Sequence, residues 1–436
     1  MTAPAYWQPE AECLERGELE QLQLERLEAT LSRAYRNVPF YRRSLDAAGF
    51  DPDQFRALED LRRLPFTTRE DLAANYPYGL FAVPLRDVVR LHASSGAASG
   101  AAVIGYTRND IRTWSNLVAR GLVAAGVTKD DVVQVALEYG LFTGAFGIHD
   151  GAERLGASVI PASSGHARRQ IRMMQDFKTT TLVGTPSYAL LLADTMAELG
   201  IDRKALSLRH GIFGAEAWSE PARAEIEARL DISATYHYGL SEVMGPGVAG
   251  ECVQRSGLHL AEDHFAVELV DPATLEPVRP GERGELVLTT LTREAFPVLR
   301  YRTRELTRLL DGPCPCGRTS LRMAPVDGRS DDAVVVRGMT VFPAQIEAEL
   351  RELEGTDPRW QMVVERRAAL DEATVLVEVS DAIFFDEMRR QAELRDRIER
   401  RLASELGVLL KVKFVQPRSI GCGAGHGRWV VDRRSP

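Results

Sequence analysis

A small segment rich in glycine and serine is the first part of the sequence in which chemistry is expected. It runs from Ser94 to Ala102 and lies between two apolar runs, Val88 to Leu91 and Val103 with Ile104. A loop of this composition after a strand can wrap backbone N–H groups around phosphate oxygens. Such loops usually add a lysine and hydroxyl side chains. This loop has serines but no lysine, so the sequence predicts a phosphate-binding loop without part of its usual charge.

Three cysteines and a histidine form a second group with metal-ligand chemistry: Cys252, His259, Cys314 and Cys316. Three thiolates and an imidazole suit a closed, tetrahedral structural zinc site. The alternative is unmetallated thiols beside a turn, because a Cys-x-Cys pair is weak support when taken alone. A catalytic zinc is not expected, since protein ligands would fill all four positions.

The elements that must position these residues follow two patterns. From about residue 87 to 232, strand-like runs such as Val132–Leu137 alternate with helical runs, which predicts a sheet with helices on its faces. Later, Ala266–Val270 and Gly284–Thr289 alternate apolar and polar residues, which predicts a small antiparallel barrel or sheet. Near the N-terminus, an apolar stripe predicts a helix over Glu18–Ala47 that bends or ends at Pro39.

A polar break over Gly328–Asp332 precedes a short region of mixed helices and strands. At 436 residues the chain is too long for one ordinary core. We therefore predict an α/β protein with two domains, residues 1–330 and residues 331–436, of which the second is a small α+β unit.

The bulk composition argues against several classes of protein. Hydrophobic residues make up 44% and charged residues 27%, as in soluble globular proteins, and the net charge of −8 argues against nucleic acid as the main partner. No apolar run reaches about 18 residues, so no membrane span is expected. The N-terminus does not read as a signal peptide, and five cysteines in such a chain favour a reducing, cytoplasmic location.

A series of short motifs, in this order, resembles the phenylacetate–CoA ligase family of the adenylate-forming superfamily. Each motif is weak alone, but together they are specific and cover nearly the whole chain. The resemblance implies a large N-terminal domain of α/β subdomains plus a small β-barrel, and a small mobile C-terminal domain that rotates between an adenylation pose and a thioester-forming pose. The motifs are Ser94–Gly96, Tyr139–Gly144, Gly151–Ala157, Gly184–Tyr188, Gly214–Glu216, Tyr238–Glu242, Arg300–Arg304, Gly328–Asp332 and Arg337–Pro343.

The resemblance implies a reaction with two halves and a set of residues for it. A carboxylate attacks the α-phosphate of ATP to give an acyl-adenylate, and a thiol, usually that of CoA, then displaces AMP. By resemblance, Glu242 is the Mg²⁺ ligand, Arg329 contacts ribose and Asp331 lies at the hinge; a helix-capping Glu242 and a plain linker Asp331 are the alternatives. The implied nucleotide-binding residues are Ser94, Ser95, Gly96, Gly214, Ala215, Glu216, Tyr238, Gly239, Glu305 and Arg329.

The same resemblance implies an acyl pocket of aromatic and small residues, which would suit a flat aromatic acid. For Phe146, ordinary core packing is an equally good interpretation. The pocket residues are Tyr139, Phe142, Gly144, Phe146, Ala215 and Tyr238.

Several positions differ from the family pattern, and most of them are positions where the family binds the phosphates of the nucleotide. Gly100 stands where the family loop has lysine, and Glu305 replaces an aspartate. His426 stands where the family has a catalytic lysine, and it is either a weaker catalytic substitute or a solvated tail residue. Removing one preorganised transition-state donor costs about 10²–10³ in rate. The expectation is therefore that use of ATP and Mg²⁺ is doubtful.

Three functions follow from these observations. The leading hypothesis is an acyl-thioester transferase that has lost or weakened adenylation and passes an acyl group to CoA, the phosphopantetheine of an acyl carrier protein, or an amine. The first alternative is a conventional ATP-dependent aryl–CoA ligase. The second is a non-catalytic protein that binds an acyl-thioester or a partner, although Glu242 and Arg329 weigh against it. A homodimer is expected from the resemblance alone.

Overall fold

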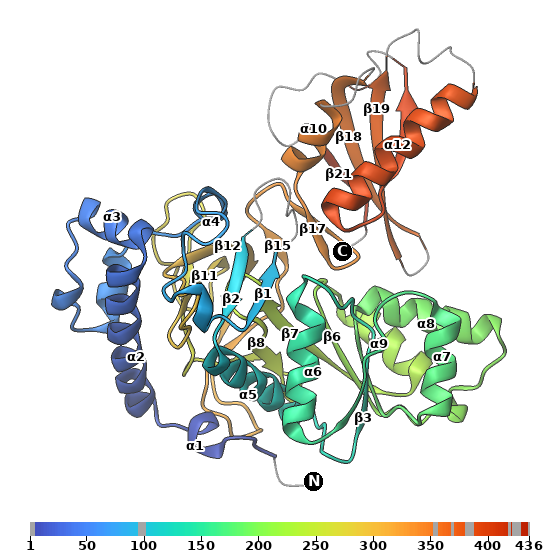
Figure 1. Cartoon of the computed structure of the whole chain (residues 1–436). Helices are drawn as coiled ribbons and strands as arrows, with labels where there is room; N and C mark the ends of the chain where they lie inside the picture. Colours follow the sequence, from blue (N-terminus) through green and yellow to red (C-terminus); the bar gives the residue numbers. More distant parts are fainter. Residues whose placement is uncertain are drawn as a thin grey trace.

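The computed structural model describes residues 5–94, 102–351, 356–367, 370–379, 388–416, 420 and 429–434. They form a large N-terminal body and a smaller C-terminal body, shown in orange and red in Figure 1. None of the described helices is long and apolar enough to cross a membrane.

The N-terminal segment is helical and packs on the small sheet of the large body. Leu27, Leu31 and Ala34 of α2 (Arg16–Asn37) are buried on one stripe. The expected break at Pro39 is confirmed, because Pro39 begins a new helix, α3 (Pro39–Ala47), after an extended Val38. The other helices here are α1 (Pro9–Glu12), η1 (Pro52–Gln54), η2 (Leu58–Arg63), α4 (Arg69–Ala74) and η3 (Leu85–Asp87).

The α2 helix is also held by polar contacts with residues far along the chain. The hydroxyl of Thr30 donates to the carbonyl of Leu291 at 2.7 Å, and the amide of Gln23 donates to the carbonyl of Glu262 at 2.8 Å. These contacts fix α2 against residues next to β10 and β11 that come more than half the chain later.

The predicted alternation of strands and helices is confirmed as one nine-stranded sheet, with order β13-β14-β9-β8-β7-β6-β5-β3-β4. The run β4-β3-β5-β6-β7 is parallel, and the strands beyond β7 are antiparallel. The strands are β3 (Val132–Val135), β4 (Ser158–Ile160), β5 (Thr181–Gly184), β6 (His210–Gly214), β7 (Ser233–Leu240), β8 (Gly245–Glu251), β9 (Leu258–Leu260), β13 (Leu309–Leu310) and β14 (Arg322–Met323).

Helices pack around this sheet, and α5 and α6 contact its strand β8 (Figure 1). A separate hairpin, β1 (Arg90–Ala93) with β2 (Val103–Tyr106), brackets the glycine-rich loop. The helices are α5 (Arg108–Ala124), α6 (Thr143–Leu155), α7 (Ala167–Asp176), α8 (Pro186–Glu198), η4 (Arg203–Ala205) and α9 (Glu220–Leu230).

The region expected to be a small barrel or sheet is a four-stranded antiparallel sheet. Its order is β10 (Phe265–Val270), β11 (Gly284–Thr290), β12 (Tyr301–Thr307) and β15 (Gly328–Arg329). Thr67 lies beside β12, where it pairs with Tyr301 in an isolated bridge. This sheet therefore connects the N-terminal segment to the Arg300–Arg304 motif.

The C-terminal body has a hydrophobic core of its own, which includes Trp360, Val375 and Ile398. A separate core is what defines an independent domain. Because the chain passes from β15 to the C-terminal body across residues 330–333, we propose the domain boundary near residue 331. The elements are β16 (Val334–Val336), β17 (Met339–Val341), α10 (Pro343–Arg351), β18 (Thr356–Arg367), β19 (Leu370–Val379), α12 (Met388–Leu406), β20 (Lys411–Val415) and β21 (Val430–Asp432), with the main sheet ordered β20-β19-β18-β21.

Candidate active site

A cavity of about 740 Å³ lies at the carboxyl ends of the parallel strands, and both bodies line it. The large body contributes Ala215 after β6 and Tyr238 on β7, and the C-terminal body contributes Gly338 and Phe342. The edge formed by the carboxyl ends of parallel strands is where open α/β sheets bind ligands.

The backbone packs tightly where β6 and β7 reach this cavity. A Cβ on Gly214 would lie 2.3 Å from the carbonyl oxygen of His237, and one on Gly239 would lie 1.9 Å from that of Gly245. Only glycine fits such approaches. Ala215 follows with a φ of 64°, in the left-handed region that an alanine rarely adopts. The motif residues Gly214, Ala215 and Gly239 thus form a closely packed wall of the cavity.

Glu216 is buried in the wall of the cavity and is held by the start of α8. The backbone N–H of Ser187 donates to its carboxylate at 3.2 Å, and the Ser187 hydroxyl donates at 2.9 Å. Burial raises the pKa of Glu216, and the two hydrogen bonds from Ser187 oppose that rise. Glu216 therefore fixes the α8 terminus beside the cavity.

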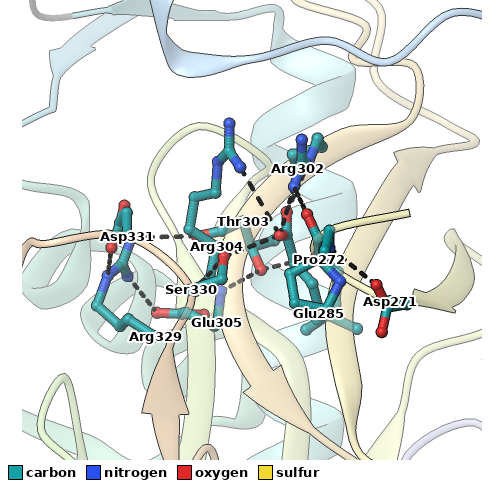
Figure 2. A network of polar contacts seen from close by, with 12 residues as sticks. Asp271, Pro272, Glu285, Arg302, Thr303, Arg304, Glu305, Arg329, Ser330 and Asp331 are labelled. Carbon is teal, nitrogen blue, oxygen red and sulfur yellow. Dashed lines mark hydrogen bonds and ion pairs between the residues drawn. The ribbon is translucent and has the colours of Figure 1, made fainter. Parts of the chain in front are cut away.

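A chain of polar contacts crosses the cavity edge from β7 to the hinge, and Figure 2 shows its part from Glu305 through Arg329 to Asp331. The Tyr238 hydroxyl donates to the carboxylate of Glu305, and Glu305 lies 3.5 Å from the guanidinium of Arg329. Arg329 in turn donates to both carboxylate oxygens of Asp331 at 2.7 and 2.8 Å. Burial raises the pKa of Glu305, and the charge of Arg329 counteracts it. The structure thus brings together four residues predicted to bind the nucleotide or form the hinge.

A second group in Figure 2 anchors the hinge to the small sheet. Arg302 donates to both oxygens of the fully buried Glu285 at 2.9 and 2.7 Å. The hydroxyl of Ser330 also donates to Glu285 at 2.8 Å, and its N–H donates to the carbonyl of Arg304 at 2.8 Å. The residue before Asp331 is therefore fixed to β11 and β12.

Glu242 lines the same cavity just after β7, and its side chain is partly buried. A partly buried carboxylate that faces a ligand cavity has the chemistry of a Mg²⁺ ligand shared with phosphates. The role of Glu242 as a Mg²⁺ ligand stays a prediction.

Arg69 is a cavity residue that the sequence reasoning missed. It is the first residue of α4, and its guanidinium carbon lies 3.4 Å from the ring centroid of Phe342 in the C-terminal body. No local motif marks it, because it reaches the cavity through the pairing of Thr67 with β12.

The predicted acyl pocket is only partly assembled. Phe142, Gly144, Ala215 and Tyr238 line the cavity, but Tyr139 and Phe146 do not belong to its lining. Those two rings pack edge to face with centroids 5.2 Å apart, and the Tyr139 hydroxyl lies 3.1 Å from Nδ1 of His149. The prediction was therefore wrong for both.

The physical reason for Phe146 lies in helix geometry. Phe146 is two residues after Gly144 on α6, and at about 100° per residue it points away from the face that Gly144 shares with the cavity. Ile148, about one turn after Gly144, does line the cavity.

The glycine-rich loop is described only at its ends. Ser94 lines the cavity, and its hydroxyl accepts the N–H of Ala102 at 3.1 Å while its own N–H donates to the carbonyl of Ala102 at 3.0 Å. These contacts close the base of the loop. The predicted residues Ser95, Gly96 and His426 lie outside the described part of the chain.

The predicted metal ligands meet in the interior, away from the cavity. Cys252, His259, Cys314 and Cys316 are all buried, and their ligand atoms lie within 4.8 Å of one another. The Cys252 and Cys314 sulfurs are 3.7 Å apart, and the Cys316 sulfur lies 3.4 Å from Nε2 of His259. Nδ1 of His259 lies 3.3 Å from the hydroxyl of Ser320, which can orient the ring. The donor set and its closure fit a structural zinc ion.

Two protein families match parts of the chain. AMP-binding enzyme matches residues 151–291, and AMP-binding enzyme C-terminal domain matches residues 338–434. The phenylacetate-coenzyme A ligase of Thermus thermophilus is 47% identical over 98% of this chain and 99% of its own length. The phenylacetate-coenzyme A ligase of Escherichia coli is 48% identical over 96% of this chain and 95% of its own.

Solved structures extend the likeness to the arrangement of the two bodies. A 2-hydroxyisobutyryl-CoA ligase with 2-HIB-AMP and CoA in its thioesterification state aligns with a TM-score of 0.93 at 30% identity, over 98% of this chain and 92% of that one. The same ligase in its postadenylation state aligns with a TM-score of 0.72 at 30% identity, over 97% of this chain and 91% of that one. The two bodies are therefore arranged more like those of the thioesterification state.

These likenesses bear directly on the functional hypotheses. They give no support to a transferase that has lost adenylation, and they fit the conventional ligase better. The error arose because side chains absent from one loop and from the C-terminal tail were taken as loss of the whole activity. The chain is an acyl-CoA ligase enzyme and belongs to the phenylacetate-coenzyme A ligase family.

Proposed function

We propose that the protein is an ATP-dependent ligase that joins an arylacetic acid, phenylacetate foremost, to CoA through an acyl-adenylate. The observation that carries the proposal is the shared cavity, whose lining includes the aromatic Phe142 together with the carboxylates Glu242 and Glu305. One cavity can therefore place an aromatic acid next to a nucleotide. The sequence identity with phenylacetate-coenzyme A ligases supports phenylacetate as the acid.

The polar residues divide into two roles. Glu305 accepts hydrogen bonds from the ribose hydroxyls, held in place by Tyr238 and Arg329. Glu242 would hold Mg²⁺, which would supply charge neutralisation at the phosphates. A longer glutamate at position 305 fits this role, because Tyr238 fixes its carboxylate at the cavity edge.

The apolar residues form the acyl end of the cavity. Phe142 and Ile148 supply flat and branched walls, and Gly144 and Ala215 leave room for a ring. A pocket with this composition favours a planar aromatic group over a charged or highly polar one.

The absence of a lysine from the glycine-rich loop is compatible with adenylation, because backbone N–H groups can hold phosphates without one. The closed base of the loop at Ser94 and Ala102 supports such a backbone cradle.

We also propose that Cys252, His259, Cys314 and Cys316 hold a structural zinc ion. CoA is the proposed acceptor, in preference to a carrier protein, and a homodimer and a cytoplasmic location stay predictions.

The test is acid-dependent exchange of pyrophosphate into ATP over a panel of aryl and arylacetic acids, followed by thioester formation with CoA. We expect phenylacetate to support both steps and to give the highest kcat/KM. A parallel reaction with a preformed acyl-CoA donor, a second thiol and no ATP tests the transferase alternative. Exchange absent with every acid, together with thiol exchange in that parallel reaction, would overturn the proposal.

A further inference from the structure

The C-terminal body reaches into the cavity through the two-residue turn of its β16–β17 hairpin. Arg337 and Gly338 form this turn, and their φ angles of 50° and 78° are both positive, as a type I′ hairpin turn requires. A Cβ on Gly338 would lie 3.3 Å from Cγ2 of Thr185 and 3.5 Å from Cβ of Ala215. The turn therefore lies against the carboxyl ends of β5 and β6, at the candidate active site.

The hairpin is too short to fix the position of its own turn. Each of its strands has three residues, and a two-stranded hairpin is only marginally stable when isolated. Val336 and Val341 pack in the core of the C-terminal body and hold the strands there. The turn lies beyond these two residues, so its position against the large body depends on further contacts.

Asp371 supplies such contacts from β19, where it lies opposite Arg366 of β18. Its carbonyl accepts the Nε–H of Arg337 at 3.1 Å, and its carboxylate accepts hydrogen bonds from Arg366 at 2.9 Å and Arg434 at 2.7 Å. Arg434 also donates to the carbonyl of Val335 on β16 at 2.8 Å. Because Asp371 is only 3% exposed, water screens these charged contacts weakly. Asp371 therefore ties both the turn and β16 to the sheet of the C-terminal body.

Asp371 also faces the large body. It lines the shared cavity together with Gly338 and Ala215, and its strand β19 contacts α8 of the large body. Burial raises the pKa of Glu216, and the negative charge of Asp371 adds to that rise, so the two carboxyl groups are within electrostatic reach. The residue that ties down the turn is thus itself at the boundary between the two bodies.

The contact between the turn and Ala215 joins the two bodies, so it depends on how they are arranged. Their arrangement is more like that of the related ligase in its thioesterification state, with a TM-score of 0.93, than in its postadenylation state, with 0.72. In the proposed function, this contact accordingly belongs to the second half-reaction.

We propose that Asp371 is a positioning residue for thioester formation, which holds the Arg337–Gly338 turn against Ala215 while CoA meets the acyl-adenylate. This assignment rests on the proposed function. Asp371 acts through its contacts with Arg337 and Arg434. Adenylation should depend on it much less, because that half-reaction uses another arrangement of the two bodies.

The first experiment separates the two half-reactions in the full-length protein. Asp371→Asn keeps the shape of the side chain and removes its charge. Glu372→Gln is the matched control, because Glu372 is the next residue of β19, points to the other face of the strand and pairs with the exposed Lys411 at 2.9 Å. Each variant is assayed for phenylacetate-dependent pyrophosphate exchange, and for thioester formation from a preformed phenylacetyl-adenylate and CoA.

We expect D371N to lower the rate constant of the thioester step by about tenfold or more, since it weakens charge-assisted hydrogen bonds. KM for CoA should change less, because the loss is in the fraction of molecules with the turn in place. Pyrophosphate exchange should stay within about threefold of the wild type, and E372Q should match the wild type in both steps.

The second experiment measures the position of the turn without any substrate. Gly338→Cys combined with Ala215→Cys should form a disulfide, because the 3.5 Å between the two Cβ positions fits the range of about 3.5–4.5 Å for such bonds. The pair is made in a Cys13→Ser background, since Cys13 is exposed. Mass spectrometry of the digested protein follows the rate of disulfide formation under a mild oxidant. Adding D371N should slow this rate by about fivefold or more, and adding E372Q should not.

An equal loss of both half-reactions in D371N would make Asp371 merely structural and would overturn the assignment. A thioester step within about threefold of the wild type, or an unchanged rate of disulfide formation, would overturn it as well. If D371N does not fold, Arg434→Lys decides by the same measurements, because lysine keeps the charge without the planar fork, and loss of the fold in both would also overturn it. Failure of the proposed function is distinguishable, since the wild type would then show no exchange with any acid while disulfide formation would still test Asp371.

Discussion

The hydroxyl of Tyr238 donates a hydrogen bond to the carboxylate of Glu305, and this contact joins the nine-stranded sheet to the four-stranded sheet at the cavity edge. Tyr238 lies on β7, the last parallel strand, and Glu305 lies on β12 of the small sheet, directly opposite Arg329 of β15. The nine-stranded sheet thereby orients a carboxylate that belongs to its neighbour.

Replacing Tyr238 by phenylalanine should remove the hydrogen bond that orients the carboxylate of Glu305, while the aromatic ring stays in place. A hydrogen bond to a charged group contributes about 1.5–3 kcal/mol, so we expect KM for ATP to rise about tenfold or more in Y238F, with a smaller change in KM for CoA. Steady-state kinetics measure both. Tyr35→Phe is the matched control, because Tyr35 makes the same kind of bond to Asp46 at 2.9 Å on the surface. Unchanged ATP kinetics in Y238F would remove Glu305 from the proposed ribose contact.

Adding one methyl group at Gly144 should alter the choice of acid. A Cβ there would lie 2.6 Å from Cε1 of Phe142, so the aromatic ring must move within the acyl end of the cavity. We expect G144A to lower kcat/KM for phenylacetate by about tenfold and to leave KM for ATP unchanged, since one methylene in such a pocket is worth about 1–3 kcal/mol. The control is Gly140→Ala, because nothing lies within 4 Å of a Cβ at Gly140. Equal kinetics for G144A and G140A would place the acyl pocket elsewhere.

The cysteine–histidine cluster should hold about one zinc ion per chain in the purified protein, as measured by elemental analysis. Closing the site contributes to folding, so Cys314→Ser or a strong chelator should lower the melting temperature by several degrees or more. Cys13→Ser should change neither quantity, because Cys13 is exposed and does not belong to the cluster. Protein that is free of zinc and melts at the same temperature with and without chelator would contradict a structural metal.

The buried Glu216 should make stability depend on pH in a predictable direction. Because burial raises its pKa in the folded state, the folded protein binds a proton at this site in a pH range where the unfolded chain has lost it. The contribution of Glu216 to stability is therefore present at low pH and is lost as the pH rises through the folded-state pKa. Relative to Glu216→Gln, the free energy of unfolding of the wild type should fall as the pH rises above the ordinary pKa of a glutamate.

Urea unfolding at several pH values measures this difference. Glu198→Gln, at an exposed position of α8, is the control and should show the same pH dependence as the wild type. A difference between E216Q and the wild type that stays constant with pH would mean that Glu216 titrates normally.

The sequence was sufficient to predict those helices and strands that are marked by residues close together in the chain. The strand expected over Val132–Leu137 is β3, and the break at Pro39 lies where a proline must stop the preceding helix. The antiparallel continuation of the main sheet through β8, β9, β14 and β13 was not predicted, because the sequence pattern does not state which strands pair with one another.

The site divides in the same way. Tyr238, Glu305 and Arg329 sit in ordered motifs, and the structure brings them together. Arg69 has no motif, because only the pairing of Thr67 with β12 carries it to the cavity. Phe146 was assigned to the pocket from the motif alone, and a motif does not state which face of α6 turns toward the cavity. Because Phe146 is two residues from Gly144 on α6, its side chain lies on a different face of the helix.

The contacts of α2 with the small sheet have a consequence for synthesis of the chain. Thr30 and its partner Leu291 are 261 residues apart, and Gln23 and Glu262 are 239 apart. At a translation rate of about 5–20 residues per second, α2 leaves the ribosome roughly 10–50 s before the residues that Thr30 and Gln23 contact. Helix α2 can pack early against α3, η1 and η2, but its attachment to the rest of the large body through Thr30 and Gln23 is completed only late in synthesis.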